Sequence, residues 1–162
     1  MAEVQLAELV EETLDETVGK YLIFMIGDEE YGIEISYITE IIGIQAITPI
    51  PEMPHYMKGI INLRGTVVPV MDVRLRFNAE EKEYGDRTSI IVVSIEDTVV
   101  GLVVDMVKEV INIDDEDIVE PPKAQEGHKN QYISGIGKTG EHVKLIIDCG
   151  RLFGDASAVS EL

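Results

Sequence analysis

The sequence predicts an all-β protein made of two five-stranded β-barrels in tandem, with short helical segments after each barrel and near the termini. Three features support this prediction: short apolar runs separated by turn residues, an internal repeat, and a repeat length that suits a small barrel. The chain has 162 residues, enough for one domain or two small ones that share a core. We expect an acidic N-terminal tail or helix over 1–18, barrels over 19–87 and 88–154, and a C-terminal tail or short helix over 155–162.

The predicted strands follow one another from Tyr21 onward. Each is a short run rich in apolar, β-branched or aromatic residues; the runs are 21–26, 31–35, 39–44, 66–71, 89–95, 99–104, 108–113 and 142–147. Residues 27–30 and 96–98 are expected to form hairpin turns. Several runs are apolar at consecutive positions, which is typical of strands that are buried on both faces because a barrel packs against its neighbour.

The repeat emerges when the chain is shifted by 101 − 32 = 69 residues, which places Gly32 on Gly101. Each copy later ends a strand in aspartate, at Asp72 and Asp148. Aspartate there is a natural N-cap, so a helical turn is expected after each barrel. Because closure removes exposed strand edges, a five-stranded unit of this size is expected to close into a barrel.

Charge and composition limit the possible partners. The chain has 13 Lys+Arg and 31 Asp+Glu, which give a net charge of −18. This negative charge argues against binding to nucleic acid or to an anionic membrane. The longest uncharged stretch, 41–51, is well short of the ~20 residues that a membrane-spanning helix needs. With a single cysteine, Cys149, and no signal-peptide pattern at the N-terminus, we expect a soluble cytoplasmic protein.

The motifs that could suggest catalysis or cofactor binding fail on inspection. The segment 135–140 resembles part of a phosphate loop, but the required earlier glycine is Tyr132 and a strand follows instead of a helix. The three histidines lack metal-ligand spacing, and the acidic run 114–117 lacks the glycine and glutamate of a calcium loop. Cys149 is interpreted as a buried structural thiol. We therefore expect no enzyme, no metal and no cofactor.

One polar motif stands in an apolar setting, at residues 59–65. Asn62 and Gly65 suit a tight turn with a positive φ. A partly buried Arg64 needs an acceptor, and Glu40 is a good candidate. Two compatible interpretations stay open: Arg64 holds the turn in place, or it forms a charged hub beside a groove for a partner.

These residues carry a resemblance to a known family. The chain resembles the CheW family of chemotaxis coupling proteins over nearly its whole length. The matching segments, which are specific in this order and spacing, are 27–33, 39–42, 58–65, 68–72 and 100–105. The stretch Asn62-Leu-Arg-Gly65 is the most recognisable of them.

The resemblance implies two packed SH3-like barrels and an adaptor that bridges the cytoplasmic tips of chemoreceptors and the regulatory domain of the histidine kinase CheA. The positions that match the family's receptor groove are Leu22, Ile35, Ile38, Glu40, Gly59, Arg64 and Val99. Kinase contacts are expected at Val107, Val110, Pro122, Lys123 and Ala124. A turn at Ser36-Tyr37 is expected to leave Ile35 and Ile38 near the barrel junction, where one of them faces solvent as part of a binding patch; that both are ordinary core residues is nearly as consistent with the sequence.

Two other functions remain possible. One is an equivalent adaptor for another receptor–kinase array, such as one that controls twitching motility. The other is a double barrel that binds a small molecule, which would need a polar cluster converging on a pocket.

Overall fold

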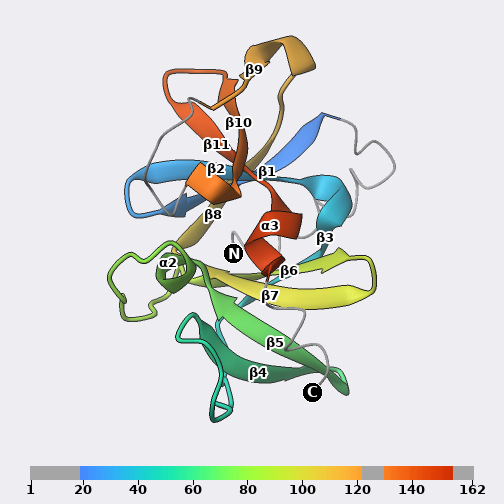
Figure 1. Cartoon of the computed structure of the whole chain (residues 1–162), viewed down its shortest axis with the longest axis vertical. Coiled ribbons are helices and arrows are strands. Elements are labelled where there is room, and N and C mark those ends of the chain that lie inside the picture. Colours follow the sequence, from blue (N-terminus) through green and yellow to red (C-terminus); the bar gives the residue numbers. More distant parts are fainter. Residues whose placement is uncertain (1–18, 122–129, 155–162) are drawn as a thin grey trace.

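The computed structural model describes residues 19–121 and 130–154 as a mainly β fold with a few short helical segments (Figure 1). The strands are β1 (Lys20–Ile26), β2 (Glu29–Glu34), β3 (Ile38–Gly43), β4 (Met57–Leu63), β5 (Thr66–Asp72), β6 (Ser89–Ile95), β7 (Thr98–Val104), β8 (Met106–Asn112), β9 (Ile118–Val119), β10 (Ile133–Lys138) and β11 (Val143–Ile147). The helical segments are η2 (Ile35–Tyr37), α2 (Val73–Arg76), η3 (Asp115–Asp117), η4 (Asn130–Tyr132) and α3 (Cys149–Phe153). The predicted all-β class is confirmed; the expected tails at 1–18 and 155–162 lie outside the described residues.

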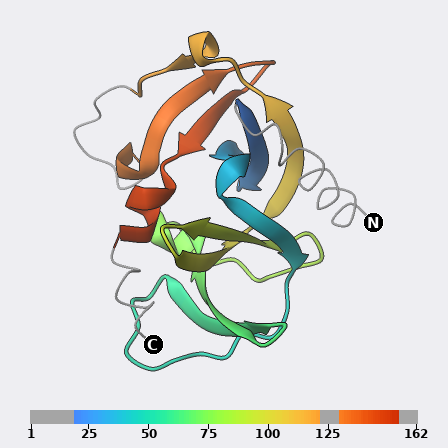
Figure 2. The ribbon, with the colours of Figure 1, turned by 90° about the vertical axis from the view of Figure 1, so that its right-hand side faces the viewer.

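The strands form two sheets that pack against each other (Figure 2). The six-stranded sheet has the order β8-β1-β2-β11-β10-β9, and the five-stranded sheet has the order β3-β6-β7-β5-β4. Within 19–121 and 130–154, no ladder joins the two edge strands of either sheet, so backbone hydrogen bonds alone do not close the predicted barrels.

The sheets exchange hairpins between the two copies of the repeat. The β1–β2 hairpin belongs to the first copy but pairs with β8 and β11, whereas the β6–β7 hairpin of the second copy pairs with β3 and β5. The exchange is symmetric: Gly32 lies opposite Ile146 in one parallel ladder, and its repeat equivalent Gly101 lies opposite Val70 in the other. The predicted boundaries, 19–87 and 88–154, therefore do not coincide with the sheets. A sequence repeat alone cannot reveal such an exchange, because a hairpin can form the same strand ladders within its own copy of the repeat or with strands of the other copy.

Three strands were absent from the predicted set: the two-residue β9, and the longer strands β4 and β10. The two longer strands share one feature. Glycine and polar residues interrupt the apolar pattern in both, at Gly59 and Asn62 in β4 and at Gly135 and Gly137 in β10. Glycine is unfavourable inside a strand unless another chain segment approaches closely. Such an approach occurs at Gly135 and Gly137, where an added Cβ would meet isoleucine side chains at 2.7 and 2.9 Å.

The predicted helix caps are confirmed. The Asp72 carboxylate accepts a hydrogen bond from the Leu75 amide, and the Asp148 carboxylate accepts one from Arg151. Asp72 also donates its backbone N–H to the Tyr56 carbonyl at 2.8 Å, and the equivalent bond from Asp148 to Tyr132 is 2.7 Å long. The short helices α2 and α3 therefore begin in the same way at the end of equivalent strands.

The main core lies between the two sheets and takes side chains from both. Its aromatic centre is Tyr31, which packs against Phe24 and Phe77 at centroid distances of 5.8 and 5.3 Å. Two smaller apolar clusters lie against the individual sheets: one around Ile90 in the five-stranded sheet, and one around Ile23 in the six-stranded sheet. Cys149 belongs to the main core and is 1% exposed, and burial raises the pKa of its thiol to about 12. The thiol is thus an apolar packing group, as the sequence indicated.

Candidate partner-binding surfaces

Three of the predicted groove residues belong to the main core. The exposed fractions of Leu22, Ile35 and Ile38 are 0%, 0% and 2%. The prediction that Ile35 or Ile38 faces solvent is therefore wrong. The reason is the 3₁₀ turn η2, in which residues three apart lie on one side: Ile35 and Ile38 both point inward, while Ser36 and Tyr37 are exposed.

Gly59 and Val99 have structural surroundings as well. Gly59 is buried with φ 141°, and an added Cβ would lie 2.0 Å from the Thr48 carbonyl oxygen. Its bare backbone lets the segment before β4 cross directly over the strand, where Thr48 and Ile60 exchange hydrogen bonds of 2.8 and 2.9 Å. Val99 is half-buried against the apolar cluster of the five-stranded sheet.

The predicted pair between Arg64 and Glu40 is present: the Arg64 guanidinium donates a hydrogen bond to the Glu40 carboxylate. Burial of Arg64, however, was wrongly predicted, since its side chain is 72% exposed and that of Glu40 is 26% exposed. The hydrogen bond and the negative charge of Glu40 raise the pKa of Arg64 above its ordinary value. The pair is thus an exposed, permanently charged feature of the surface.

The turn between β4 and β5 determines where Arg64 points. Arg64 and Gly65 both have left-handed backbone, with φ 51° and 89°, which is the geometry of a two-residue hairpin turn. Asn62 does not itself adopt a positive φ, in contrast to the prediction; its side-chain oxygen accepts a hydrogen bond of 2.8 Å from the Gly65 amide. This bond holds the turn that carries Arg64 out to Glu40.

Exposed valines mark both ends of the molecule. Val67, 62% exposed, follows the β4–β5 turn, and Val143, 54% exposed, follows the β10–β11 turn. The two positions are equivalent, because a shift of 148 − 72 = 76 superposes the end of β5 on that of β11 and places Val67 on Val143. In Figure 1 the β10–β11 turn lies at the upper end of the long axis and the β4–β5 turn at the lower end. We call Glu40, Arg64 and Val67 the Arg64 surface.

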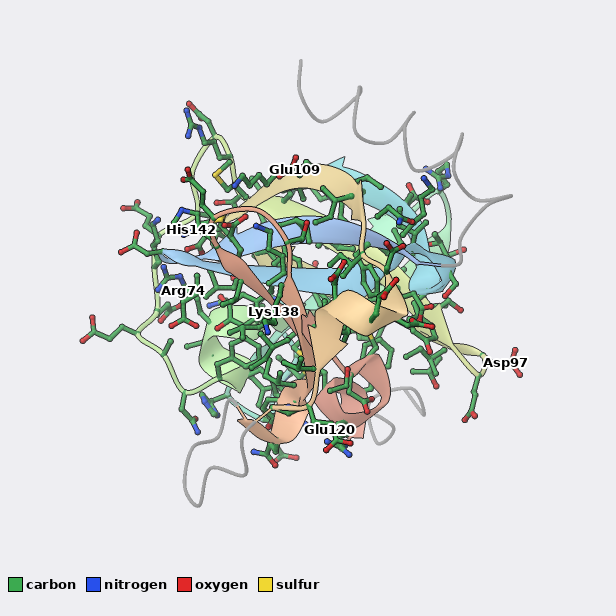
Figure 3. All side chains as sticks on the ribbon, turned by 90° about the horizontal axis from the view of Figure 1, so that it is seen from above. Arg74, Asp97, Glu109, Glu120, Lys138 and His142 are labelled. Carbon is green, nitrogen blue, oxygen red and sulfur yellow. The ribbon has the colours of Figure 1, made fainter. Side chains whose placement is uncertain are left out.

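A hollow of about 480 Å³ lies between the β1–β2 hairpin, β8 and the start of β11, and is lined by Met25, Asp28, Glu29, Glu30, Lys108, His142, Val143 and Leu145. We call this group the Val143 surface. Figure 3 shows His142 and Glu109 toward the same side of the six-stranded sheet and Glu120 away from them. Apolar side chains from β1 and β11 thus meet charged side chains from the β1–β2 hairpin and β8.

A buried charge network forms the floor of this hollow. The side chain of Glu30 is 5% exposed and lies 2.8 Å from Lys108 and 3.5 Å from Lys144, which is 7% exposed. Burial alone would raise the pKa of Glu30, but the hydrogen bond from Lys108 and the charges of both lysines lower it below its ordinary value. Lys144 also donates to the His142 carbonyl at 2.9 Å and thereby fixes the chain before Val143. This network was not predicted from the sequence, where its one signal is a lysine within the apolar run 143–147.

The predicted kinase residues have mixed positions. Val107 is 9% exposed, and Val110 is half-buried against the main core. Pro122, Lys123 and Ala124 lie outside the described residues. The exposed side chains of β8 beside them are Lys108 and Glu109, so this strand presents charge to solvent and not the predicted valines.

Among residues 19–121 and 130–154, no three histidine, cysteine or acidic side chains are grouped to hold a metal ion. Over the same ranges, no helix has the length and apolar character that crossing a membrane requires.

Comparison with known proteins identifies the family. The model of the CheW-like domain matches residues 20–157. A chemotaxis protein CheW of Klebsiella aerogenes is 38% identical over 138 residues, which cover 85% of this chain and 83% of that protein. The chain belongs to the CheW family. The CheW of Treponema pallidum is 34% identical over 134 residues, 80% of this chain and 79% of that protein.

A solved structure supports the fold of this CheW-family protein. The crystal structure of the scaffolding protein TtCheW from Thermoanaerobacter tengcongensis matches with a TM-score of 0.78 at 37% identity, covering 84% of this chain and 92% of that one. CheW-family proteins are non-catalytic scaffolds, and membership in the family confirms the expectation that the chain is not an enzyme.

Proposed function

We propose that this chain is an adaptor that couples the cytoplasmic tips of transmembrane chemoreceptors to the histidine kinase CheA. Family membership and relatives named as chemotaxis proteins support this function. The observation that carries the two-partner arrangement is the pair of equivalent exposed valines, Val67 and Val143, at the two ends of the molecule. One compact protein with a distinct surface at each end can hold two partners at once.

The Arg64 surface is the proposed site for the receptor. A receptor helix presents an apolar stripe with polar flanks, and such a helix docks on an apolar surface rimmed by polar groups. Val67 supplies exposed apolar area, and the exposed Arg64–Glu40 pair supplies both a donor and an acceptor beside it. Leu22, Ile35, Ile38 and Gly59 are buried, so they cannot themselves contact a partner.

The Val143 surface is the proposed site for the kinase. Its hollow is lined by the apolar side chains of Met25, Val143 and Leu145 and by charged groups that include Lys108 and Asp28. Interfaces concentrate binding energy where an apolar anchor fills such a pocket and polar groups surround it. The buried Glu30 network keeps the floor of the hollow fixed, so little ordering is needed on binding.

Charge adds a further condition on both partners. Because the chain carries a net charge of −18, its partners are expected to present basic surfaces, and association should slow as salt is added. With these partners the protein works in the cytoplasm, at the receptor tips.

Calorimetric titration of the full chain with a receptor cytoplasmic fragment and with the CheA regulatory domain tests the proposal. Arg64→Ala is expected to weaken receptor binding about tenfold or more and to leave kinase binding unchanged, whereas Val143→Asp should do the reverse. Asp86→Ala, in the exposed loop before β6, is the matched control. The opposite pattern would mean that the two surfaces are interchanged, and full binding by both variants would reject both sites.

A further inference from the structure

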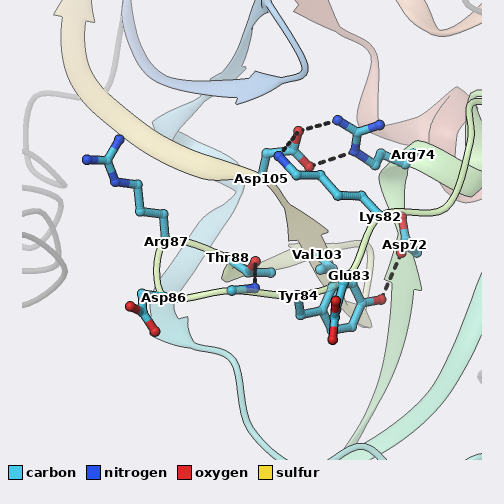
Figure 4. Close-up of a pocket in the computed structure, with 11 residues that line it drawn as sticks. Asp72, Arg74, Lys82, Glu83, Tyr84, Asp86, Arg87, Thr88, Val103 and Asp105 are labelled. Atoms are coloured by element: carbon cyan, nitrogen blue, oxygen red, sulfur yellow. Dashed lines mark hydrogen bonds and ion pairs between the residues drawn. The ribbon is translucent and has the colours of Figure 1, made fainter.

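Asp105 lies where the chain crosses from the five-stranded sheet to the six-stranded sheet, between β7 and β8. Its side chain is 14% exposed, and Figure 4 shows it facing the guanidinium of Arg74. Arg74 donates through Nε at 2.8 Å and through Nη2 at 2.6 Å, which is the two-pronged geometry of a strong arginine–carboxylate pair. The Gly27 amide donates a third hydrogen bond of 2.7 Å.

These three bonds join segments that are far apart in the chain. Gly27 begins the β1–β2 turn of the six-stranded sheet, whereas Arg74 lies in α2, directly after β5 of the five-stranded sheet. The backbone N–H of Asp105 also donates to the Met25 carbonyl at 3.1 Å. Burial alone would raise the pKa of Asp105, but the bonds from Arg74 and Gly27 lower it, so the carboxylate stays ionised in its buried position.

The equivalent corner of the molecule lacks this arrangement. The shift of 69 places Asp105 on Ser36 and Gly27 on Glu96, and the shift of 76 places Arg74 on Gly150. Ser36 and Gly150 are exposed and offer no charge pair. The β6–β7 turn there has left-handed backbone at Glu96 and Asp97, with φ 45° and 68°, a conformation that costs free energy in residues other than glycine.

The β1–β2 turn borders the Val143 surface. Asp28, Glu29 and Glu30 all line its hollow, and they follow Gly27 directly. A group that fixes Gly27 thus fixes one wall of that surface.

We propose that Asp105 is a positioning residue: by joining Gly27 to Arg74 it holds the β1–β2 turn in place and keeps the Val143 surface preformed. The repeat-equivalent β6–β7 turn lacks this bond. The identity of the partner at the Val143 surface rests on the proposed function, whereas the positioning of the turn does not. A preformed surface binds more tightly because less ordering is required on association.

Hydrogen exchange of the full chain measures the positioning directly, without any partner. In Asp105→Asn, the Gly27 amide is expected to exchange about tenfold faster or more, with no change over 96–98. If Asp105→Asn fails to fold, the milder variant Arg74→Lys is expected to show the same effect. Lys58→Gln, which breaks the surface pair with Glu81 at 2.6 Å, is the matched control. Unchanged exchange at Gly27 in a folded variant, or equal acceleration throughout the chain, overturns the proposal.

Binding then tests the consequence. Affinity for the CheA regulatory domain is expected to fall about fivefold to tenfold in Asp105→Asn, with unchanged affinity for the receptor fragment. If Val143→Asp weakens kinase binding but Asp105→Asn does not, preorganisation by Asp105 is rejected. If neither variant affects the kinase, the site assignment under the proposed function has failed, and faster exchange at Gly27 still supports the positioning role.

Discussion

The Arg64 guanidinium bonds to the Glu40 carboxylate and thereby connects the β4–β5 turn to β3 at the opposite edge of the five-stranded sheet. No backbone ladder joins β3 to β4 among residues 19–121 and 130–154, so at this end a side-chain pair bridges the gap that a closed barrel would fill with hydrogen bonds. An exposed pair of this kind contributes little to stability. Its proposed role is to present fixed charge to a partner.

Removing Arg64 is therefore expected to affect binding and not folding. Arg64→Ala should leave the melting temperature within about 2 °C of wild type, because exposed ion pairs contribute little and the mutation leaves no buried charge unpaired. Receptor affinity should fall in the same variant. The charge-swapped double variant Glu40→Arg/Arg64→Glu restores the ion pair with the two charges exchanged. If it also restores receptor binding, then binding requires the ion pair and not a particular charge at position 40 or 64. A large loss of stability in Arg64→Ala would contradict the exposed position.

Ile38→Asp is expected to unfold the protein. Ile38 is 2% exposed in the main core, and an unpaired carboxylate there should cost roughly 3–5 kcal/mol or more. Ile38→Val, which removes one methylene, should cost about 0.5–1.5 kcal/mol and keep the fold. Urea unfolding of both variants measures the difference. A folded Ile38→Asp that has lost only receptor binding would instead return Ile38 to the groove.

Gly59 and Gly65 provide a matched pair of glycine substitutions. Both have positive φ, but an added Cβ at Gly59 would clash with the Thr48 carbonyl oxygen, whereas nothing lies within 4 Å of one at Gly65. Gly65→Ala should cost about 1 kcal/mol from backbone conformation alone. Gly59→Ala should cost clearly more, because the segment that crosses β4 must move. Equal losses in urea unfolding would show that backbone conformation, and not close approach, requires Gly59.

Stability should fall at alkaline pH. The thiol of Cys149 keeps its proton to about pH 12 in the folded protein, whereas the unfolded thiol ionises near its ordinary pKa of 9.0. Burial also raises the pKa values of Tyr31 and Tyr84. In this range the unfolded state binds fewer protons, so the free energy of unfolding falls as pH rises above about 9.

Urea unfolding at about pH 8 and about pH 10.5 should show a loss of roughly 1–3 kcal/mol. Cys149→Ala removes the thiol contribution and should flatten the slope, after allowance for its own packing cost. In the folded wild type the thiol should also react slowly with a disulfide reagent. Stability that is constant or rises over this range would contradict the burial of these three groups.

The sequence determined the local features of this protein, because these depend on neighbouring residues. Alternating and continuous apolar runs defined most strands, and aspartates 72 and 148 defined the helix caps. The pairing of Arg64 with Glu40 was also predicted, because a guanidinium in an apolar setting needs an acceptor. The resemblance to the CheW family was recognised from short sequence motifs that occur in a specific order and spacing.

Only the tertiary structure decided which strands pair and which side chains reach solvent. Exchanged and unexchanged hairpins satisfy the same repeat, so the mixed composition of the two sheets could not be inferred from it. The exposure of Arg64 depends on a left-handed turn, and the burial of Ile38 depends on a three-residue 3₁₀ segment. The bonds of Asp105 and Glu30 join residues 31 to 78 positions apart, and only the folded chain brings such groups together.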